Sequence, residues 1–512
     1  MRAAKKSFLN ILTGVLGQCI TIAIGLLLPR LFITSYGSET NGFLSSINNL
    51  IYYLTLLEAG IGGATIQALY GPIAKGDRGK INGILAATNL FYKRTGVIYG
   101  LCVLAMAVIY PLLVPSELSP ALQVGIILLV GSSGVIGYLF QAKFRLLLQA
   151  EGKQYVIANV TTGVHVLTSI GKLICVMLGL MVIWLQVVHF ALALFSMAIY
   201  YLYIHKNYQW LDLNVQPDEQ AIAQKGYVLV HQVSEMIFNH VDVLLLTFLL
   251  KDLKIVSVYV LYTLFVDMVS TLISNVNTGF VFKLGQLFNS DRKSFEPVFD
   301  LYETYYMAFS FALYTVTYLF LMPFMRLYTA GVSDANYLLP WLPLLFVAYK
   351  LLVCGRAACG GLASYAGHFQ QTRWHSICET AINLLVSIGT VILFEKYWNT
   401  GIYGVLLGTL AALIFRANIM IVYANTKILP RGSWSTYRKW LLDFAIMIGG
   451  CAIFRLANPR LDSYPRLIAW AGVWCAMFLA GFFVINALCN ISQARWLYRQ
   501  VTGMMRMRFA KG

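Results

Sequence analysis

The chain has 512 residues, of which 59% are hydrophobic and only 12% are charged. A soluble domain carries about 25% charged residues, so a soluble protein of this length could not cover so much apolar surface. Composition therefore excludes a soluble globular protein and indicates an integral membrane protein. The formal net charge of +17 does not indicate a nucleic-acid partner, because the basic residues lie in loops between apolar segments.

Apolar runs of the ~20 residues needed to cross a bilayer recur along the whole chain. The first run follows basic residues but continues past Leu28 without a small-residue cleavage site, so it is expected to be a retained helix rather than a signal peptide. We predict about fourteen transmembrane helices, at 9–34, 42–68, 95–114, 121–141, 156–178, 181–204, 228–250, 255–281, 299–325, 338–362, 375–394, 401–424, 440–457 and 465–489.

Basic residues predict the orientation of these helices. With the N-terminus inside, the inner segments hold most of the lysines and arginines, as the positive-inside rule requires. An even number of spans returns the C-terminal tail to the same side, where it carries Arg495, Arg499 and Lys511. The chain is therefore expected to be a multi-pass protein of the cytoplasmic (cell) membrane with both termini cytoplasmic.

A long polar connection and a weak internal repeat predict the organisation of the bundle. Asp77-Arg78 precedes Phe91-Tyr92, and Asp291-Arg292 precedes Tyr305-Tyr306 at the same spacing. Both segments enter the third helix of their half, as expected for a duplicated transporter lobe. The predicted fold is all-α: an N-terminal six-helix lobe (1–205), a cytoplasmic linker (206–226), a pseudo-symmetric second six-helix lobe (227–425), two additional transmembrane helices (426–489) and a basic cytoplasmic tail (490–512).

Charged residues inside the apolar spans are the candidates for function. A charge at the bilayer centre costs at least ~2.5 kcal/mol on insertion scales, so such residues line an aqueous cavity, pair with each other or snorkel to the interface. Snorkelling explains Arg30 and Arg356 as well as function does, because both lie toward span ends. The candidates are the acidic Glu58, Asp242 and Asp267 and the basic Arg30, Lys172, Lys350, Arg356 and Arg416.

Motifs of soluble enzymes and metal sites are missing from the sequence. None of the nine cysteines forms a CxxC pair, and the histidines are dispersed. The sequence has no Walker loop, no GxSxG and no HExxH. We therefore expect a transporter rather than an enzyme, with no cofactor and no metal.

Three stretches of the chain resemble a known family. They are LLEAGIGGATIQALYGPIAKGD (56–77), KFRLLLQAEGKQYVIANV (143–160) and the segment 231–267. They look like the corresponding regions of the oligosaccharide-lipid flippases and polysaccharide transporters, within the multidrug/oligosaccharidyl-lipid/polysaccharide exporter superfamily. The similarity extends over most of the chain to about residue 425.

The resemblance implies a function and assigns roles to the candidates. Members of that family move a polyprenyl-diphosphate-linked oligosaccharide across the cytoplasmic membrane by alternating access, for cell-surface polysaccharide biosynthesis. By this resemblance the basic candidates Arg30, Lys172, Lys350, Arg356 and Arg416 would bind the diphosphate or acidic sugars in a cavity. Glu58, Asp242 and Asp267 would couple transport to a cation, H⁺ or Na⁺. Membrane lipids and glycan-assembly enzymes are further expected partners.

Two alternative functions remain open from the sequence. A cation-coupled multidrug exporter of the same superfamily is disfavoured because the first span has no acidic residue, where many such antiporters carry a coupling carboxylate. A membrane-embedded glycan polymerase or ligase is disfavoured because the predicted outer loops are about ten residues or fewer. Such enzymes usually need a larger external loop with a catalytic arginine or histidine.

Overall fold

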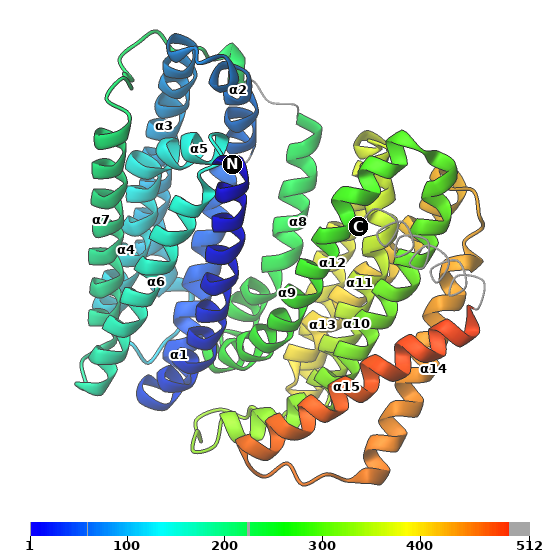
Figure 1. Ribbon diagram of the computed structural model, residues 1–512. Coiled ribbons are helices and arrows are strands. Elements are labelled where there is room, and N and C mark those ends of the chain that lie inside the picture. Colours follow the sequence, from blue (N-terminus) through cyan, green and yellow to red (C-terminus); the bar gives the residue numbers. More distant parts are fainter. Residues whose placement is uncertain (1, 59, 223–225, 491–512) are drawn as a thin grey trace. The chain divides into compact units, whose positions relative to one another are not determined.

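A computed structural model describes residues 2–58, 60–222 and 226–490 (Figure 1). Every regular element in these ranges is a helix. Most of the predicted basic tail and residues 223–225 of the predicted linker lie outside the described residues. The prediction of an all-α membrane protein is confirmed.

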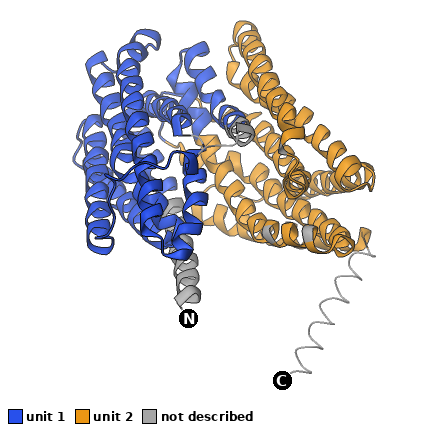
Figure 2. Cartoon of the chain, turned by 90° about the horizontal axis from the view of Figure 1, so that it is seen from above, with its two compact units in different colours: residues 1–260, 331–335 blue, residues 261–330, 336–512 orange. Residues whose placement is uncertain are grey.

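The chain divides into two compact units (Figure 2). Unit 1 comprises residues 1–260 and 331–335, and unit 2 comprises residues 261–330 and 336–512. The helices that begin in unit 1 are α1 (Arg2–Leu54), α2 (Ile61–Lys75), α3 (Arg78–Leu113), α4 (Pro120–Ile136), α5 (Ala142–Ala150), α6 (Gln154–Met177), α7 (Val182–Asn207), α8 (Gly226–Leu245) and α9 (Leu253–Ser290). Those that lie in unit 2 are α10 (Arg292–Tyr328), α11 (Leu342–Tyr365), α12 (Phe369–Trp398), α13 (Gly401–Tyr423), α14 (Trp434–Ala457) and α15 (Tyr464–Cys489).

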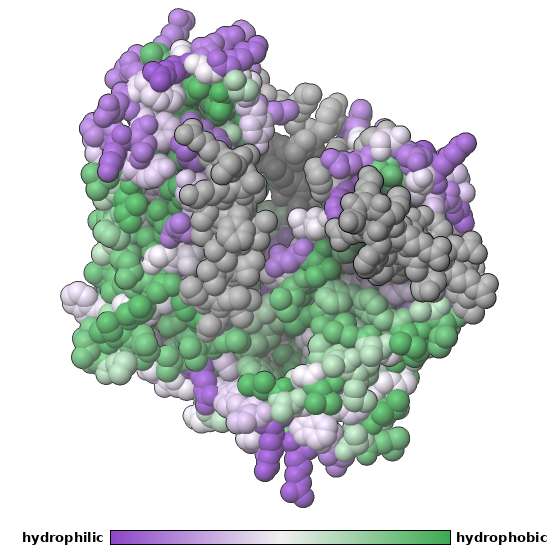
Figure 3. Space-filling model, viewed as in Figure 1, coloured by the Kyte–Doolittle hydropathy of each residue, from purple (hydrophilic) through white to green (hydrophobic). Residues whose placement is uncertain are grey.

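Eleven stretches of the described part are long and apolar enough to cross a membrane. They correspond one by one to the third to sixth and eighth to fourteenth predicted spans. Large apolar side chains stay exposed along them, such as Leu112 on α3 at 80% and Leu456 on α14 at 86%. Figure 3 shows hydrophobic residues along the helices and hydrophilic residues gathered at helix ends and loops. This surface is the one that a bilayer solvates.

The chain breaks at Gly37, between the first two predicted spans, and it breaks again inside the second span, where no break was predicted. Gly37 has φ of 82° and ψ of 164°, which separates two helical segments within α1. The second span, predicted as one helix over 42–68, is interrupted by a 3₁₀ turn at Thr55–Glu58. Gly60 then adopts a left-handed conformation with φ of 86°, and α2 begins at Ile61. Glycine permits both breaks because it has no Cβ to clash at positive φ.

The two segments of the predicted repeat have similar local structures. The Asp77 carboxylate caps α3 by accepting a hydrogen bond of 3.0 Å from the backbone N–H of Lys80. The Asp291 carboxylate caps α10 by accepting from the backbone N–H groups of Lys293 and Ser294. Aspartate is favoured at such positions because it satisfies donors that have no partner in the helix. The predicted lobe boundary within 206–226 stays a prediction; α8, which follows it, belongs to unit 1.

Candidate functional site

Two predicted arginines meet on one carboxylate inside unit 2. The Arg356 Nη1 on α11 lies 2.5 Å from Glu379 Oε1 on α12. The Arg416 Nε on α13 lies 3.4 Å from the other oxygen of the same carboxylate. Glu379 lies about ten residues into α12, roughly 15 Å from its start at a rise of 1.5 Å per residue. We call these three residues the Arg–Glu–Arg cluster; it lies well inside the helices rather than at their ends.

Hydrogen-bonding capacity is left unused in this cluster. The Nε and Nη1 atoms of Arg416 are buried and form no hydrogen bond, so Nε contacts Glu379 only as an ion pair, and the residue is 9% exposed. The Nδ1 atom of His375, one helical turn before Glu379, is also buried without a partner. The side chain of Arg356 keeps 24% of its surface exposed. Two guanidinium groups and one carboxylate sum to a charge of +1, which suits an anionic ligand.

The register of α12 against α13 explains why these side chains meet. His375, Glu379, Asn383 and Ser387 follow each other at intervals of four residues and so share one face of α12. Along this face the Asn383 Nδ2 donates to Thr409 Oγ1 on α13 over 3.0 Å, and Ser387 Oγ donates to the Val405 carbonyl over 3.3 Å. This polar stripe, unusual inside a membrane helix, fixes the two helices side by side.

Two glycines let the backbones approach closely. A Cβ added at Gly404 would lie 2.5 Å from the backbone N of Val391, and one at Gly408 would lie 2.1 Å from Ser387 Oγ. Arg416 lies eight residues after Gly408 and therefore on the same face of α13. Glycine contacts therefore set the register that places Arg416 opposite Glu379.

Lys350 forms a separate site with Asp267. The Lys350 Nζ on α11 lies 2.5 Å from Asp267 Oδ1 on α9, and their side chains are 15% and 50% exposed. This contact pairs a predicted substrate-binding residue with a predicted coupling residue. Lys350 and Arg356 are six residues apart on α11, so they point to different sides of the helix.

The acidic candidates of unit 1 are held by tyrosines. Glu58 ends the 3₁₀ turn after α1, where its carboxyl group interacts with the hydroxyl groups of Tyr92 and Tyr138. Asp242 on α8 is 6% exposed and accepts a hydrogen bond of 2.6 Å from the Tyr259 hydroxyl. The break of the second span therefore places Glu58 on a turn rather than on a regular helix.

The basic candidates of unit 1 lie on α1 and α6. Arg30 follows Pro29 within α1 and is half-buried. Lys172 on α6 is half-buried near His165 and His189, and no carboxylate among the described side chains forms an ion pair with it. Arg30 and Lys172 belong to unit 1, whereas Lys350, Arg356 and Arg416 belong to unit 2.

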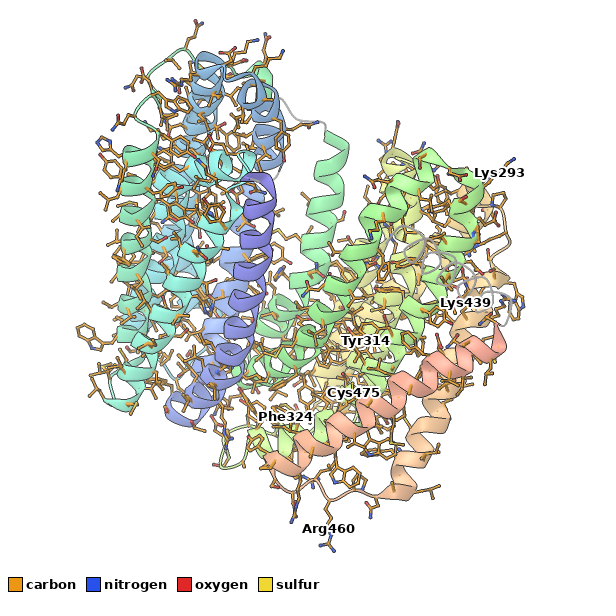
Figure 4. The ribbon with its side chains drawn as sticks, viewed as in Figure 1. Lys293, Tyr314, Phe324, Lys439, Arg460 and Cys475 are labelled. Carbon is orange, nitrogen blue, oxygen red and sulfur yellow. The ribbon has the colours of Figure 1, made fainter. Side chains whose placement is uncertain are left out.

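A buried charge network that the sequence analysis did not predict lies between α10 and α14. The Lys439 Nζ lies 2.6 Å from both Asp300 Oδ1 and Glu303 Oε2, and the Arg431 guanidinium contacts the same two carboxylates at 2.9 and 2.7 Å. Figure 4 labels Lys439 near the start of α14 and Arg460 beyond its end. The sequence signal was the three-residue spacing of Asp300 and Glu303, which puts both on one side of α10.

Metal binding receives no support from the described side chains. Among them, no group of three or more His, Cys, Asp or Glu residues is arranged to hold an ion.

Together these helices define an all-α membrane protein with the fold of the multidrug and lipid-flippase transporters. The structure of the lipid II flippase MurJ in an inward closed conformation matches with a TM-score of 0.63, at 15% identity, covering 94% of this chain and 100% of that one. An inward-facing multidrug resistance MATE transporter of the MOP superfamily matches with a TM-score of 0.61, at 14% identity, covering 80% of this chain and 94% of that one. The MATE transporter VcmN of Vibrio cholerae matches with a TM-score of 0.55, at 15% identity, covering 84% and 98%.

These likenesses confirm the predicted superfamily resemblance at the level of the fold. Neither a scan against protein-family models nor a search of curated proteins found a match.

Proposed function

We propose that this chain is a transporter that moves a polyprenyl-diphosphate-linked oligosaccharide across the cytoplasmic membrane by alternating access. The observation that carries the proposal is the Arg–Glu–Arg cluster, in which two buried Arg416 nitrogens form no hydrogen bond. Buried charges in membrane helices are costly and mark functional sites unless they are fully paired. A diphosphate is a ligand that planar guanidinium groups bind through two parallel hydrogen bonds.

The remaining candidates receive roles under this proposal. Lys350, paired with Asp267, and Lys172, which forms no ion pair with a described carboxylate, are further contacts for the anionic cargo. Glu58, Asp242 and Asp267 are the candidates for coupling to H⁺ or Na⁺. Both termini lie on the cytoplasmic side, where the basic loops face the anionic leaflet.

A cation-coupled multidrug exporter is the alternative, and the MATE structures match the same fold. Two observations favour the lipid-linked cargo. The sequence up to Gly37 contains no aspartate or glutamate, so the part of α1 before this break offers no coupling carboxylate. The flippase structure covers 94% of this chain, whereas the first MATE structure covers 80%.

A glycan polymerase or ligase finds less support. On the side opposite the predicted cytoplasm, the longest connection between described helices is 329–341, between α10 and α11. Its sequence, TAGVSDANYLLPW, contains neither arginine nor histidine.

The test is export of lipid-linked glycan by Arg416→Ala. We expect the variant to insert into the membrane at the wild-type level and to lose most of the export. Arg466→Ala is the matched control, because Arg466 pairs with Asp462 in an exposed position where both side chains are more than half accessible. Full export by Arg416→Ala, or export of cationic drugs but not of glycan by the wild type, would refute the proposal.

A further inference from the structure

Glu379 is the carboxylate on which Arg356 and Arg416 meet. Its side chain is only 8% exposed, and its two oxygens lie 2.5 and 3.4 Å from the two guanidinium groups. An anionic group that bridges both guanidinium groups must compete with this carboxylate, because it accepts from donors that Glu379 now contacts.

We propose that Glu379 occupies the anion site in the empty protein, and that an anionic group of the cargo displaces it while Glu379 takes up one proton. This inference deepens the proposed function and rests on it. It assigns to Glu379, which the sequence analysis did not single out, the role of coupling cargo binding to proton uptake.

The physical reason is the cost of a buried charge. A carboxylate that loses its cationic partners in a poorly accessible place is strongly disfavoured unless it becomes neutral. For a singly charged ligand group, one anion enters and one carboxylate is neutralised, so the cluster keeps its charge of +1. The proton comes from solution and is released when the cargo leaves.

Three charged or titratable groups lie around Glu379 among the described side chains. Arg356 comes from α11, Arg416 from α13, and His375 lies one turn earlier on α12 itself. A guanidinium group does not lose its proton in proteins near neutral pH, so a pH dependence must come from a different kind of group. His375 is such a group, and it therefore needs its own control variant.

The ligand class is an oxyanion that presents two oxygens to a guanidinium. Its source is either the diphosphate of the lipid carrier or the carboxylate of an acidic sugar in the glycan. Both would bind Arg416, whose buried Nε and Nη1 form no hydrogen bond in the structure, and would take the place of Glu379 Oε2 beside Nε.

The experiment measures anion binding to the purified full chain in detergent at several pH values. The probe is methanesulfonate, a singly charged oxyanion that does not titrate in the working range. For the wild type, we expect the Kd to fall as the pH falls, by up to about tenfold per pH unit for one linked proton. Glu379→Gln should bind more tightly than the wild type at high pH, with little dependence on pH. Equal pH dependence in both proteins would overturn the proposal, as would weaker binding by Glu379→Gln.

Three further arms complete the test. His375→Gln should keep the wild-type pH dependence, and loss of that dependence in His375→Gln alone would overturn the role of Glu379. Arg416→Lys, which keeps the charge, should bind the probe more weakly while remaining monodisperse; unchanged binding would overturn the site.

A competition experiment distinguishes the two sources of the anion. Competition by inorganic pyrophosphate rather than glucuronate would assign the site to the lipid diphosphate, and competition by glucuronate rather than pyrophosphate would assign it to an acidic sugar.

Failure of this inference is distinguishable from failure of the proposed function. If export requires Arg416 but binding is independent of Glu379, the transporter proposal stands and the displacement mechanism is wrong. If Arg416→Ala exports glycan normally, the proposed function itself fails.

Discussion

Lys439 on α14 and Glu303 on α10 form an ion pair of 2.6 Å in which neither side chain exposes more than 1% of its surface. Asp300 and Arg431 complete the network, and Thr436 Oγ1 donates to Glu303 over 2.9 Å. Every charge in it has an opposite partner, which is the condition under which a buried ion pair is tolerated. The network therefore attaches α14 to the helices of unit 2.

Lys439→Met is expected to destabilise the protein by about 3–5 kcal/mol, because it leaves the buried Glu303 and the partly exposed Asp300 with one cation. Thermal unfolding of the purified protein in detergent would measure this loss. Arg466→Met is the control, since its partner Asp462 and Arg466 itself are 59% and 58% exposed and such a pair contributes about 1 kcal/mol or less. Equal unfolding temperatures for both variants would show that the buried network does not stabilise the fold.

Gly408→Ala should weaken the contact between α12 and α13. A Cβ at this position would lie 2.5 Å from the backbone N of Ser387, so the helices must separate, at a cost of about 1–3 kcal/mol. Gly389→Ala on α12 is the control, because a Cβ there meets nothing within 4 Å. The control should be neutral or slightly stabilising, as alanine favours a helix over glycine by about 1 kcal/mol.

The same substitution also tests the register that places Arg416 opposite Glu379. Anion binding should fall in Gly408→Ala and stay at the wild-type level in Gly389→Ala. Wild-type stability and binding in Gly408→Ala would mean that the two helices can separate without cost.

Lys172→Met separates stability from function. Lys172 is half-buried and forms no ion pair with a carboxylate among the described residues, so its charge costs free energy that methionine would not. We expect the unfolding temperature to stay level or rise while glycan export falls, which is the usual trade-off at functional sites. A variant that unfolds earlier but exports normally would assign Lys172 a structural role instead.

Hydropathy was sufficient to predict the helices, because an apolar segment in a bilayer must satisfy its own backbone hydrogen bonds and an α-helix does so. It could not predict that Thr55–Glu58 leaves the α-helix, since Gly60 is one of many glycines and only its φ of 86° marks the break. The search for charged residues inside apolar spans identified Arg356 and Arg416 as candidates, but it did not identify Glu379, the carboxylate that both contact. Pairing depends on the register between α12 and α13, which short contacts at Gly404 and Gly408 determine.

The charge network at α10 and α14 was missed for a different reason. Asp300 and Glu303 lie where the predicted span begins, and Lys439 lies just before another predicted span. Charges at span ends are usually read as interfacial, because lysine and arginine can snorkel to water. Here neighbouring helices bury Lys439 and Glu303, so these charges are not interfacial. A single sequence does not show which helices pack against each other.

The pair of Lys350 with Asp267 offers the last test. Each single variant, Lys350→Met or Asp267→Asn, leaves one charge without this partner, whereas the double variant removes both. We expect the double variant to be more stable than the two single effects predict, by about 1 kcal/mol, because Asp267 is half exposed and solvent screens the pair. If Lys350 contacts the anionic cargo, export should nevertheless stay as low in the double variant as in Lys350→Met. Recovery of export together with stability would instead make the pair structural, and Lys350 would then be removed from the transport path.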